Sequence, residues 1–369
     1  MNILHLSGST GWGGNEQQLV DLIYGLEKIH VSNTLFCFKD SSLEIYAKEN
    51  NLKHYSIPKF KAYALKYAKL LNNYVKKHHP DVIHIHTSNS VTAFVIADII
   101  YKLKTPTVFS KKGIGGSTSK LSIFKYNYKN INKIVCVSKA VKDAFKSVVK
   151  TRNHHKLCVV YDGIKVERSE HKSTVNLRKH FSIERSKILI GNIANHTRAK
   201  DLVTLVKTAN ELVHTLGVKN IHFIQIGKTG KYSNEFLPLI QEYNLDSFFT
   251  VTGFLDHAMD LLTQLDLYLM TSEREGLPIT IYEAFLKKIP IVTTAAGGIP
   301  EAITHGENGM LSDVKDFNSL ALNLKELIKE KSLQESFAEK SHKLLFEKFT
   351  TIQLAENTLS IYKDLIKND

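Results

Sequence analysis

Two series of short apolar segments, each followed by a longer helix-like pattern, constrain this sequence more than any other feature. The segments of the first half are "NILHLS", "NTLFCF", "DVIHIH", "TVFS" and "KIVCVS", with helical patterns from near Asn15 and over residues 62–78 and 89–103. After a looser stretch around residues 162–186 the pattern resumes with "KILIGNIA", "IHFIQIG", "FFTVTGF", "LDLYLMTS" and "IPIVTT", and from about residue 316 the chain is helical. Strands that are apolar on both faces and separated by helices predict parallel sheets covered by helices. Two series in 369 residues therefore predict two doubly wound α/β domains, with ligands bound in the cleft between them.

Composition bounds the class of protein. Hydrophobic residues make up 43% of the chain and charged residues 23%, which is typical of a soluble globular protein. Cys37, Cys136 and Cys158 lie in or beside apolar runs without a CxxC pair, which favours buried thiols in a reducing compartment. The opening "MNILHLS" lacks the basic lead of a signal peptide, and no apolar run approaches the roughly 18 residues of a membrane span. We therefore expect a cytoplasmic protein that does not cross a membrane.

Positive charge is concentrated in the first half of the chain. Residues 1–170 carry 26 Lys and Arg against 12 Asp and Glu, whereas residues 171–369 carry 23 against 24. This excess is either a solubilising surface or one that meets something anionic, such as phospholipid or a phosphorylated acceptor. The segment "IPKFKAYALKYAKLLNNYVKKHH" fits both a helix lying on a membrane and a core-packed helix with a basic outer face. Nucleic acid is disfavoured as a partner, because no recognised binding motif accompanies the charge.

A glycine-rich turn, "LSGSTGWGGNEQQL", follows the first predicted strand and opens a helix. Glycines such as Gly13 and Gly14 let the backbone approach a ligand closely, and the N-terminus of the following helix favours negative charge. The spacing is not GxGxxG, and the second strand runs into Lys39 rather than an acidic residue, so a dinucleotide site is disfavoured. The turn is either a phosphate-approaching loop or a tight connection.

The stretch "TSEREGLPITIYEAFLKKIPIVTTAAGGIPE" holds two carboxylates, Glu275 and Glu283. The apolar "DLYLMTS" predicts a buried strand, and Pro278 suits the first turn of the next helix. Glu275 is then expected in the strand-to-helix loop and Glu283 in the second helical turn. Amides at a helix N-terminus bind anions, and carboxylates accept hydrogen bonds from hydroxyl groups. The pattern therefore favours a site for a sugar diphosphate nucleotide over the acid/base pair of a hydrolase.

This stretch, "SEREGLPITIYEAF" followed by "KKIPIVTTAAGGIPEAITHGENGML", resembles the signature of the retaining family 4 type glycosyltransferases with the GT-B fold. The resemblance covers nearly the whole chain: "GWGGNEQQL" resembles the family's N-terminal glycine loop, and "GNIANHTRAKDLVTLVKTA" its diphosphate-binding strand and loop. It implies two Rossmann-like domains facing across a cleft, with the last helix crossing back to the first domain. The expected bounds are residues 1–165 plus 350–369 for an acceptor-binding domain and 166–349 for a nucleotide-sugar-binding domain.

The resemblance also implies a role for each matching residue. Glu283 would bind the nucleotide ribose, the catalytic Glu275 would bind a hydroxyl of the donor sugar, and the catalytic Lys200 would neutralise the departing phosphate. The segment that holds the diphosphate would be Gly276, Leu277, Pro278, Ile279 and Thr280. Gly13 and Gly14 would line the donor phosphates or the acceptor from the opposite wall.

Asn195 and Lys112 depart from the family pattern. Asn195, a donor-binding candidate, stands where many members have an arginine, and Arg198 is the available substitute for that catalytic guanidinium. Lys112 in "FSKKG" stands where many members have a histidine, and it is a candidate contact to donor or acceptor. At the domain junction the sequence has "VVYDGI" where the family usually has N-G-I.

The sequence does not predict a metal site. His84 and His86 alternate along "DVIHIH" without a convincing third ligand, so core or cleft histidines are favoured over a zinc site. His86 is a second candidate contact to acceptor or donor. No DxD motif occurs, which favours a metal-independent enzyme without a cofactor, in which cationic side chains replace the ion.

These features predict a retaining hexosyltransferase. It would move a hexose from a nucleotide-diphosphate sugar, such as a UDP-sugar, onto a glycan or lipid-linked acceptor in lipopolysaccharide, capsule or other surface polysaccharide biosynthesis. It would be cytoplasmic and peripheral on the inner face of the membrane, with its basic half on the anionic lipid surface. Two alternatives stay open: a nucleotide-sugar epimerase of the same fold, which needs no acceptor, and a catalytically silent sugar-nucleotide binding protein.

Overall fold

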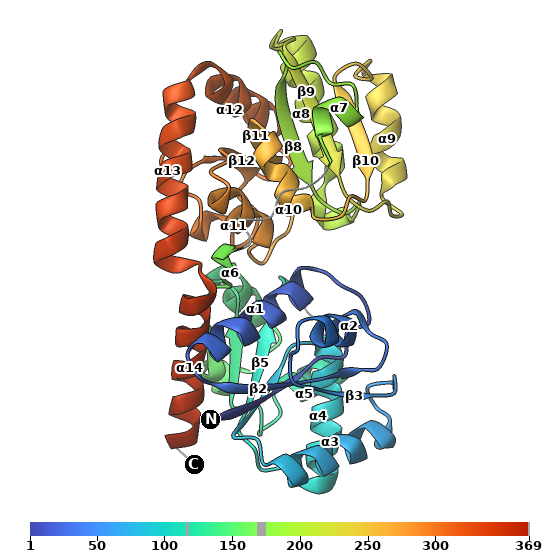
Figure 1. Ribbon diagram of the computed structural model, residues 1–369, viewed down its shortest axis with the longest axis vertical. Helices are drawn as coiled ribbons and strands as arrows, with labels where there is room; N and C mark the ends of the chain where they lie inside the picture. The colour runs from blue at the N-terminus through green and yellow to red at the C-terminus, as the bar shows by residue number, and fades with distance from the viewer. Residues whose placement is uncertain (116–117, 168–174, 368–369) are drawn as a thin grey trace. The chain divides into compact units, whose positions relative to one another are not determined.

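The computed structural model describes residues 1–115, 118–167 and 175–367, and the chain forms two compact α/β units (Figure 1). Unit 1 comprises Met1–Ile164 and Phe349–Asp369, and unit 2 comprises Lys165–Lys348. Each unit is a parallel sheet with helices packed against it, so the predicted fold class is confirmed. The assignment of one domain to the acceptor and the other to the donor stays a prediction.

Unit 1 contains a seven-stranded parallel sheet with the order β3-β2-β1-β4-β5-β6-β7. Its strands are β1 (Asn2–Leu6), β2 (Ser32–Phe38), β3 (His54–Ile57), β4 (Val82–Ile85), β5 (Thr107–Lys111), β6 (Lys133–Cys136) and β7 (Leu157–Val159). Its helices are α1 (Gly14–Lys28), α2 (Ser42–Glu49), α3 (Leu65–His78), α4 (Ser88–Tyr101), α5 (Lys120–Tyr126), α6 (Lys139–Phe145) and α14 (Thr351–Lys367). Every residue of β4 is buried, as expected for a central strand covered on both faces.

The end of the chain is built into unit 1, where α14 lies along α1 (Figure 1). Leu22 and Leu26 of α1 share a buried cluster with Leu354 and Tyr362 of α14. The two helices approach closely at Gly25, where an added Cβ would lie 2.3 Å from the carbonyl oxygen of Thr351. A side chain at this position would therefore push the helices apart.

Unit 2 contains a six-stranded parallel sheet with the order β10-β9-β8-β11-β12-β13. Its strands are β8 (Ile188–Ile193), β9 (Ile221–Ile226), β10 (Phe249–Gly253), β11 (Leu267–Met270), β12 (Ile291–Thr294) and β13 (Met310–Ser312). Its α-helices are α7 (Leu177–His180), α8 (Leu202–Asn210), α9 (Ser233–Glu242), α10 (Ala258–Leu261), α11 (Ile279–Leu286), α12 (Phe317–Lys329) and α13 (Lys331–Lys348). Leucine, isoleucine and phenylalanine side chains of the sheet and of α8, α9 and α12 form its main core.

Sequence analysis missed three short strands, β3, β7 and β13. Each has only three or four residues, and β3 reads "HYSI", whose burial is partial, so no apolar run marked it. The looser stretch around residues 162–186 contains α7, and its residues 168–174 lie outside the described part of the chain. Among the described residues, no helix has the length and apolar character required to cross a membrane.

Both sheets have a point at which the strand order reverses. In unit 1 this point lies between the neighbours β1 and β4, and in unit 2 between β8 and β11. The loops that leave the carboxyl ends of two such strands diverge to opposite faces of the sheet and leave a crevice where ligands bind. Each unit therefore offers one such crevice, which we call its switch point.

Candidate active site

The switch point of unit 2 gathers most of the residues expected to act on the donor. Residues 194–201 leave β8, and residues 271–278 leave β11, which pairs with β8 in parallel register. The two loops are joined by hydrogen bonds from the Glu273 N–H to the Ala199 carbonyl, at 2.9 Å, and from the Thr271 hydroxyl to the Asp201 carbonyl, at 3.0 Å. These bonds fix the relative positions of the charged side chains that the loops carry.

Lys200 and Glu275 form an ion pair across these loops. The Lys200 Nζ lies 2.6 Å from Glu275 Oε1, which also accepts a hydrogen bond from the Ser272 hydroxyl at 2.7 Å. The Lys200 side chain is 24% exposed and the Glu275 side chain 12%, so both charges are partly withdrawn from water but reachable by a ligand. The structure thus brings together two of the three predicted catalytic residues.

The backbone around Lys200 is shaped by Asp201. Asp201 adopts a left-handed conformation with φ 43°, and its carboxylate caps α8 by accepting hydrogen bonds from the Thr204 N–H and hydroxyl. A short 3-10 turn, Arg198–Lys200, precedes it. The lysine therefore stands on a tight, capped corner rather than on a free loop.

The second carboxylate, Glu283, lies in the second turn of α11, as predicted. Pro278 takes the position immediately before α11 rather than one in its first turn, and its carbonyl accepts the Ile281 N–H at 3.1 Å. Both Glu283 and Glu275 act on Tyr268, because their charges, after burial as the larger cause, raise the pKa of its phenol.

The segment from Gly276 to Thr280 leads into the N-terminus of α11. Gly276 and Leu277 are buried, whereas Pro278, Ile279 and Thr280 are half-buried. A helix N-terminus attracts negative charge through its backbone amides and dipole. The segment predicted to bind the donor and Lys200 therefore stand at the same crevice, since both follow the switch-point strands.

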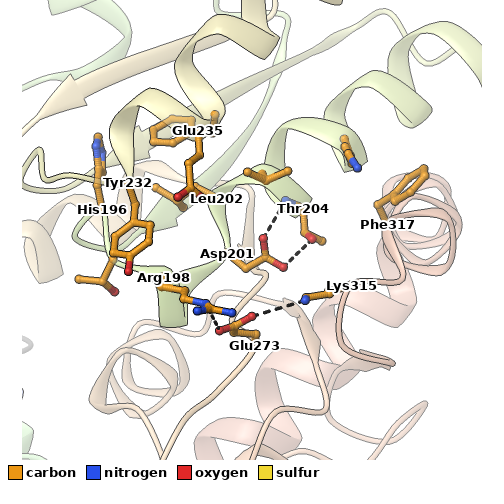
Figure 2. Close-up of a pocket in the computed structure, with 14 residues that line it drawn as sticks. His196, Arg198, Asp201, Leu202, Thr204, Tyr232, Glu235, Glu273, Lys315 and Phe317 are labelled. Atoms are coloured by element: carbon orange, nitrogen blue, oxygen red, sulfur yellow. Dashed lines mark hydrogen bonds and ion pairs between the residues drawn. The ribbon is translucent and has the colours of Figure 1, made fainter.

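Arg198 is turned into a neighbouring cavity of unit 2 (Figure 2). Its Nε lies 3.5 Å from Glu273 Oε1, and Lys315 Nζ lies 3.7 Å from the other carboxylate oxygen. The cavity has a volume of about 540 Å³, and its described lining includes Arg198 and Glu273 but neither Lys200 nor Glu275. The predicted substitution of the missing arginine by Arg198 is therefore not realised in this arrangement.

Asn195 links two loops at the carboxyl edge of the unit 2 sheet. Its Oδ1 accepts a hydrogen bond from the Lys228 N–H at 2.8 Å, which links the loop after β8 to the loop after β9. Between them, a Cβ added at Gly227 would lie 1.9 Å from the Ala194 carbonyl oxygen, so only glycine fits there. Asn195 holds loop geometry in this structure, and its contact to a donor stays a prediction.

The glycine loop of unit 1 lies at that unit's own switch point. Gly13 precedes α1 and Gly14 begins it, both exposed, and no side chain caps the helix at Gly13. The Gly8 N–H donates to the Thr87 hydroxyl at 3.2 Å, and the Asn15 side chain donates to the His86 carbonyl at 3.4 Å. These bonds join the loop after β1 to the loop after β4.

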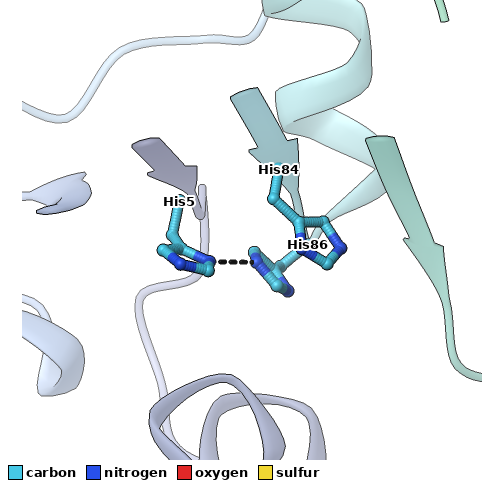
Figure 3. A group of neighbouring side chains, drawn as sticks. All are labelled: His5, His84 and His86. Carbon is cyan, nitrogen blue, oxygen red and sulfur yellow. Dashed lines mark hydrogen bonds between the residues drawn. The ribbon is translucent and has the colours of Figure 1, made fainter. Parts of the chain in front are cut away.

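His86 belongs to a cluster of three buried histidines, His5, His84 and His86, on the two neighbouring strands β1 and β4 (Figure 3). Their ring nitrogens lie within 4.8 Å of one another, so the geometry admits a metal ion. Sequence analysis found no third ligand because His5 stands about 80 residues earlier in the chain, and that part of the interpretation was wrong. The preference for core histidines agrees with the burial of all three side chains. The absence of a metal from this site stays a prediction.

Hydrogen bonds occupy most ring nitrogens of this cluster. His5 donates Nε2–H to Asn33 Oδ1 at 3.0 Å, so its Nδ1 accepts from His86 Nε2 at 3.0 Å. His84 contacts the Tyr362 hydroxyl of α14 and, at 2.8 Å, the Ser110 hydroxyl. Burial lowers the pKa of His5 to about 4, and it lowers the pKa of the other two as well. The histidines are therefore neutral near pH 7 and tie α14 to the sheet.

Lys112 forms a buried ion pair with Asp162. The side chains are 20% and 6% exposed, and burial raises the pKa of the Asp162 carboxyl while Lys112 opposes that rise. Lys112 stands where the family resemblance places a histidine, and Asp162 where it places an asparagine. The Lys112 ammonium and the Asp162 carboxylate thus neutralise each other inside unit 1.

Comparison with known proteins gives the class. A model described as glycosyltransferase family 4 matches residues 12–168, and a model described as glycosyl transferases group 1 matches residues 173–344, so that the two matches together span most of the chain. The chain therefore belongs to the glycosyltransferases with the GT-B fold, as the sequence motifs predicted.

Individual relatives agree with this class. The chain is 23% identical over 331 residues to N-acetyl-alpha-D-glucosaminyl L-malate synthase of Bacillus anthracis, covering 88% of this chain and 85% of that protein. It is 23% identical over 323 residues to the O-antigen biosynthesis glycosyltransferase WclY of Escherichia coli, covering 83% and 85%. The crystal structure of Anabaena Alr3699/HepE in complex with UDP and glucose superimposes with a TM-score of 0.84 at 19% identity, covering 99% of this chain and 100% of that one.

Proposed function

We propose that this glycosyltransferase takes a hexose from a nucleotide-diphosphate sugar and transfers it, with retention of configuration and without a metal ion, to a glycan or glycolipid. The observation that carries the proposal is the Lys200–Glu275 pair at the switch point of unit 2, beside the N-terminus of α11. A cation, a carboxylate and a helix N-terminus are the groups that a phosphate and an adjoining sugar require.

The ion pair suits an exchange of partners when the donor binds. The diphosphate offers Lys200 a more highly charged partner than Glu275, and the freed carboxylate can accept a hydroxyl of the sugar. As the bond to the leaving diphosphate breaks, negative charge grows on its oxygens, and a fixed ammonium and aligned amides stabilise that charge. Glu283, in the second turn of α11, is assigned to the ribose.

Retention follows if the acceptor attacks from the face that the diphosphate leaves, with a phosphate oxygen taking the acceptor proton. Glu275 is held by Lys200 and Ser272 through one oxygen and serves as a hydroxyl acceptor rather than as a nucleophile. The cations of the chain supply the charge that a bridging metal supplies in other transferases.

The proposed setting is surface polysaccharide biosynthesis on the cytoplasmic face of a membrane. The Escherichia coli relative is named for O-antigen biosynthesis, and the Anabaena relative was solved with UDP and glucose. The basic half of the chain and the exposed Leu65, at 66%, beside the lysines of α3 support contact with an anionic lipid surface. No binding to anionic vesicles in low-salt flotation would remove this part of the proposal.

The test is a transfer assay with UDP-glucose, UDP-galactose, UDP-N-acetylglucosamine and GDP-mannose, each with a lipid-linked glycan extract. We expect release of nucleoside diphosphate with one donor, unaffected by EDTA, and an α-linked product from an α-linked donor in the proton NMR spectrum. A β-linked product contradicts retention, and loss of activity in EDTA contradicts metal independence. An epimerised donor formed without acceptor identifies the epimerase, and no reaction with any donor favours the silent protein.

A further inference from the structure

Unit 1 contains a cavity of about 530 Å³ at its own switch point, which we call the unit 1 cavity. Its walls are the loop after β1, with Gly8 and Thr10, the first turns of α4, and the segment of residues 59–63 between β3 and α3. Ligands of doubly wound sheets bind at this place. The cavity is therefore where the fold itself predicts a ligand in unit 1.

The charge of the cavity is entirely positive. Lys59 and Lys61 line it, and no aspartate or glutamate is among its described lining residues. Between Asn50 and Pro80 the sequence holds seven lysines and no acidic residue. Within the described part of the chain neither Lys59 nor Lys61 is in an ion pair; the Lys61 ammonium lies 5.8 Å from the centroid of the Tyr63 ring. These two cations are unneutralised by the protein and select an anionic ligand.

Aromatic and hydroxyl groups complete the cavity. Tyr63 is 63% exposed and Phe60 half-buried, so ring faces are available beside the lysines, whereas Tyr67 is 2% exposed. The Tyr67 hydroxyl lies near Ser90 and makes no hydrogen bond of normal geometry. Aromatic rings beside a few convergent polar groups bind the apolar faces and the hydroxyls of a sugar.

We propose that the unit 1 cavity is an acceptor subsite for a sugar ring that carries a carboxylate or a phosphate. Lys59 and Lys61 bind the anionic group, Phe60 and Tyr63 lie against the ring, and the Tyr67 hydroxyl bonds a ring hydroxyl. The role of the bound sugar as the acceptor rests on the proposed function, whereas its negative charge is inferred from the lysines of the cavity.

A lipid surface is the weaker occupant for these two lysines. A membrane contacts a convex face, and the lysines suited to it, Lys66, Lys69, Lys76 and Lys77 of α3, lie outside the lining of the cavity. A hollow of this volume fits one or two sugar rings and admits their substituents. The two groups of lysines can therefore be tested separately.

The experiment measures binding to the whole chain by saturation-transfer NMR titration with methyl glucuronide, glucose 6-phosphate and methyl glucoside. We expect at least one anionic sugar to bind about tenfold more tightly than the neutral glucoside, as contacts from the two exposed ammonium groups of Lys59 and Lys61 would give together. Binding of the glucuronide alone identifies a uronate, and binding of glucose 6-phosphate alone a phosphosugar. Equal affinity for the neutral glucoside, or no binding of either anionic sugar, overturns the proposal.

Two matched double variants locate the binding. The double variant Lys59→Gln with Lys61→Gln should weaken the binding of the anionic sugar about tenfold. The double variant Lys66→Gln with Lys69→Gln removes the same charge from the same region, but outside the cavity, and should leave the affinity for that sugar unchanged. Equal losses in both variants would show a diffuse charge effect. Binding only to phosphatidylglycerol vesicles, weakened equally by both pairs, would assign these lysines to a membrane; either result overturns the proposal.

Failure of this inference is distinguishable from failure of the proposed function. UDP-sugars should stabilise both double variants as they stabilise the wild-type chain, because none of the four lysines lies in unit 2. Stabilisation by a UDP-sugar without binding of an anionic sugar refutes the subsite alone. Binding of the anionic sugar without stabilisation by any nucleotide sugar refutes the donor site and leaves the cavity's ligand class standing.

Discussion

The two units share one architecture and differ in how they treat charge at the switch point. In unit 2 the cations are paired: Lys200 with Glu275, and Arg198 and Lys315 with Glu273. In unit 1 the cavity lysines Lys59 and Lys61 have no carboxylate among the described lining residues, and the ion pair Lys112–Asp162 lies outside that lining. A paired site can exchange partners with a ligand that brings both phosphate and hydroxyl groups, whereas an unpaired one attracts a simple anion.

This difference shows that the loops, rather than the strands, determine what each switch point can bind. The strands at both switch points are apolar or neutral, and the charged groups stand on the loops that leave them. The rigid sheets position the loops, and the loops carry the chemistry.

The largest effect is expected from Glu275→Gln in unit 2. The amide oxygen can still accept hydrogen bonds from Lys200 and Ser272, so the chain should fold and bind nucleotide, but the negative charge near the reacting sugar is lost. We expect kcat to fall about a hundredfold. The matched change in unit 1, Lys59→Gln with Lys61→Gln, should instead raise the KM for acceptor. An unchanged kcat in Glu275→Gln would remove its assigned role.

The second effect concerns the buried pair of unit 1. Lys112→Met leaves the Asp162 carboxylate buried without a cation, and we expect the free energy of unfolding in urea to fall by about 3 kcal/mol. The double variant Lys112→His with Asp162→Asn, which restores the family pattern, should lose clearly less than the sum of its single variants.

The control for this pair lies in unit 2. Lys288 and Glu339 also form an ion pair, but their side chains are 45% and 67% exposed. Lys288→Met should cost at most about 0.5 kcal/mol, since solvent screens exposed pairs. Equal costs at both positions would show that burial does not decide the strength of these pairs.

The third effect is on pH. The pKa of His5 is about 4 in the fold against 6.5 for the ordinary group, so the unfolded chain binds more protons between these values and stability falls as pH drops from 6.5 toward 4. We expect about 2 kcal/mol of lost stability between pH 7.5 and pH 5. His84 and His86 add to this in unit 1, whereas unit 2 has His222, whose pKa is also lowered to about 4.

Hydrogen exchange read by peptide can separate the units. Peptides from β1 and β4 should lose protection at pH 5 more than peptides from β9. Unit 1 has three buried histidines with lowered pKa values on or directly after these strands, whereas unit 2 has His222 on β9. Replacement of His5 by Asn, which cannot take up a proton, should flatten the pH dependence in unit 1. Equal losses in both units would contradict the attribution to the histidine cluster.

The smallest effect separates two cations of unit 2. Lys200→Met should weaken UDP-sugar binding about tenfold in calorimetry, because its ammonium stands at the crevice beside α11. Arg198→Met should weaken it less than about threefold, because that side chain is 72% exposed and pairs with Glu273 in the neighbouring cavity. Equal losses would show that Arg198 turns to the diphosphate when the donor binds.

Sequence patterns predicted the sheets and the main loop of the site well. The strands before Glu275 and Lys200 are apolar, and the signature from Glu275 to Glu283 is local, so its geometry follows from a strand, a proline and a helix. The short strands β3, β7 and β13 escaped because some of their residues are polar or only partly buried, whereas β4 and β11, with four residues each, are buried throughout.

Contacts between distant residues could not be predicted in the same way. His5 meets His84 only because β1 and β4 are neighbours in the sheet, and Asp162 meets Lys112 across 50 residues. The orientation of Arg198 depends on Glu273 and Lys315, which come from other loops. The sequence held a clue to one of these contacts, because Lys112 and Asp162 both differ from the family pattern and carry opposite charges.

The most direct test of the account is thermal stability with UDP-, GDP-, ADP- and dTDP-sugars, with and without EDTA, in the wild-type chain and in Lys200→Met. A ligand at a hundred times its dissociation constant stabilises the fold by about 2.7 kcal/mol. The account predicts a rise in melting temperature with the sugars of one base, unchanged by EDTA and reduced in Lys200→Met. No rise with any of them, or an equal rise in both chains, would contradict a donor site built on Lys200 and Glu275.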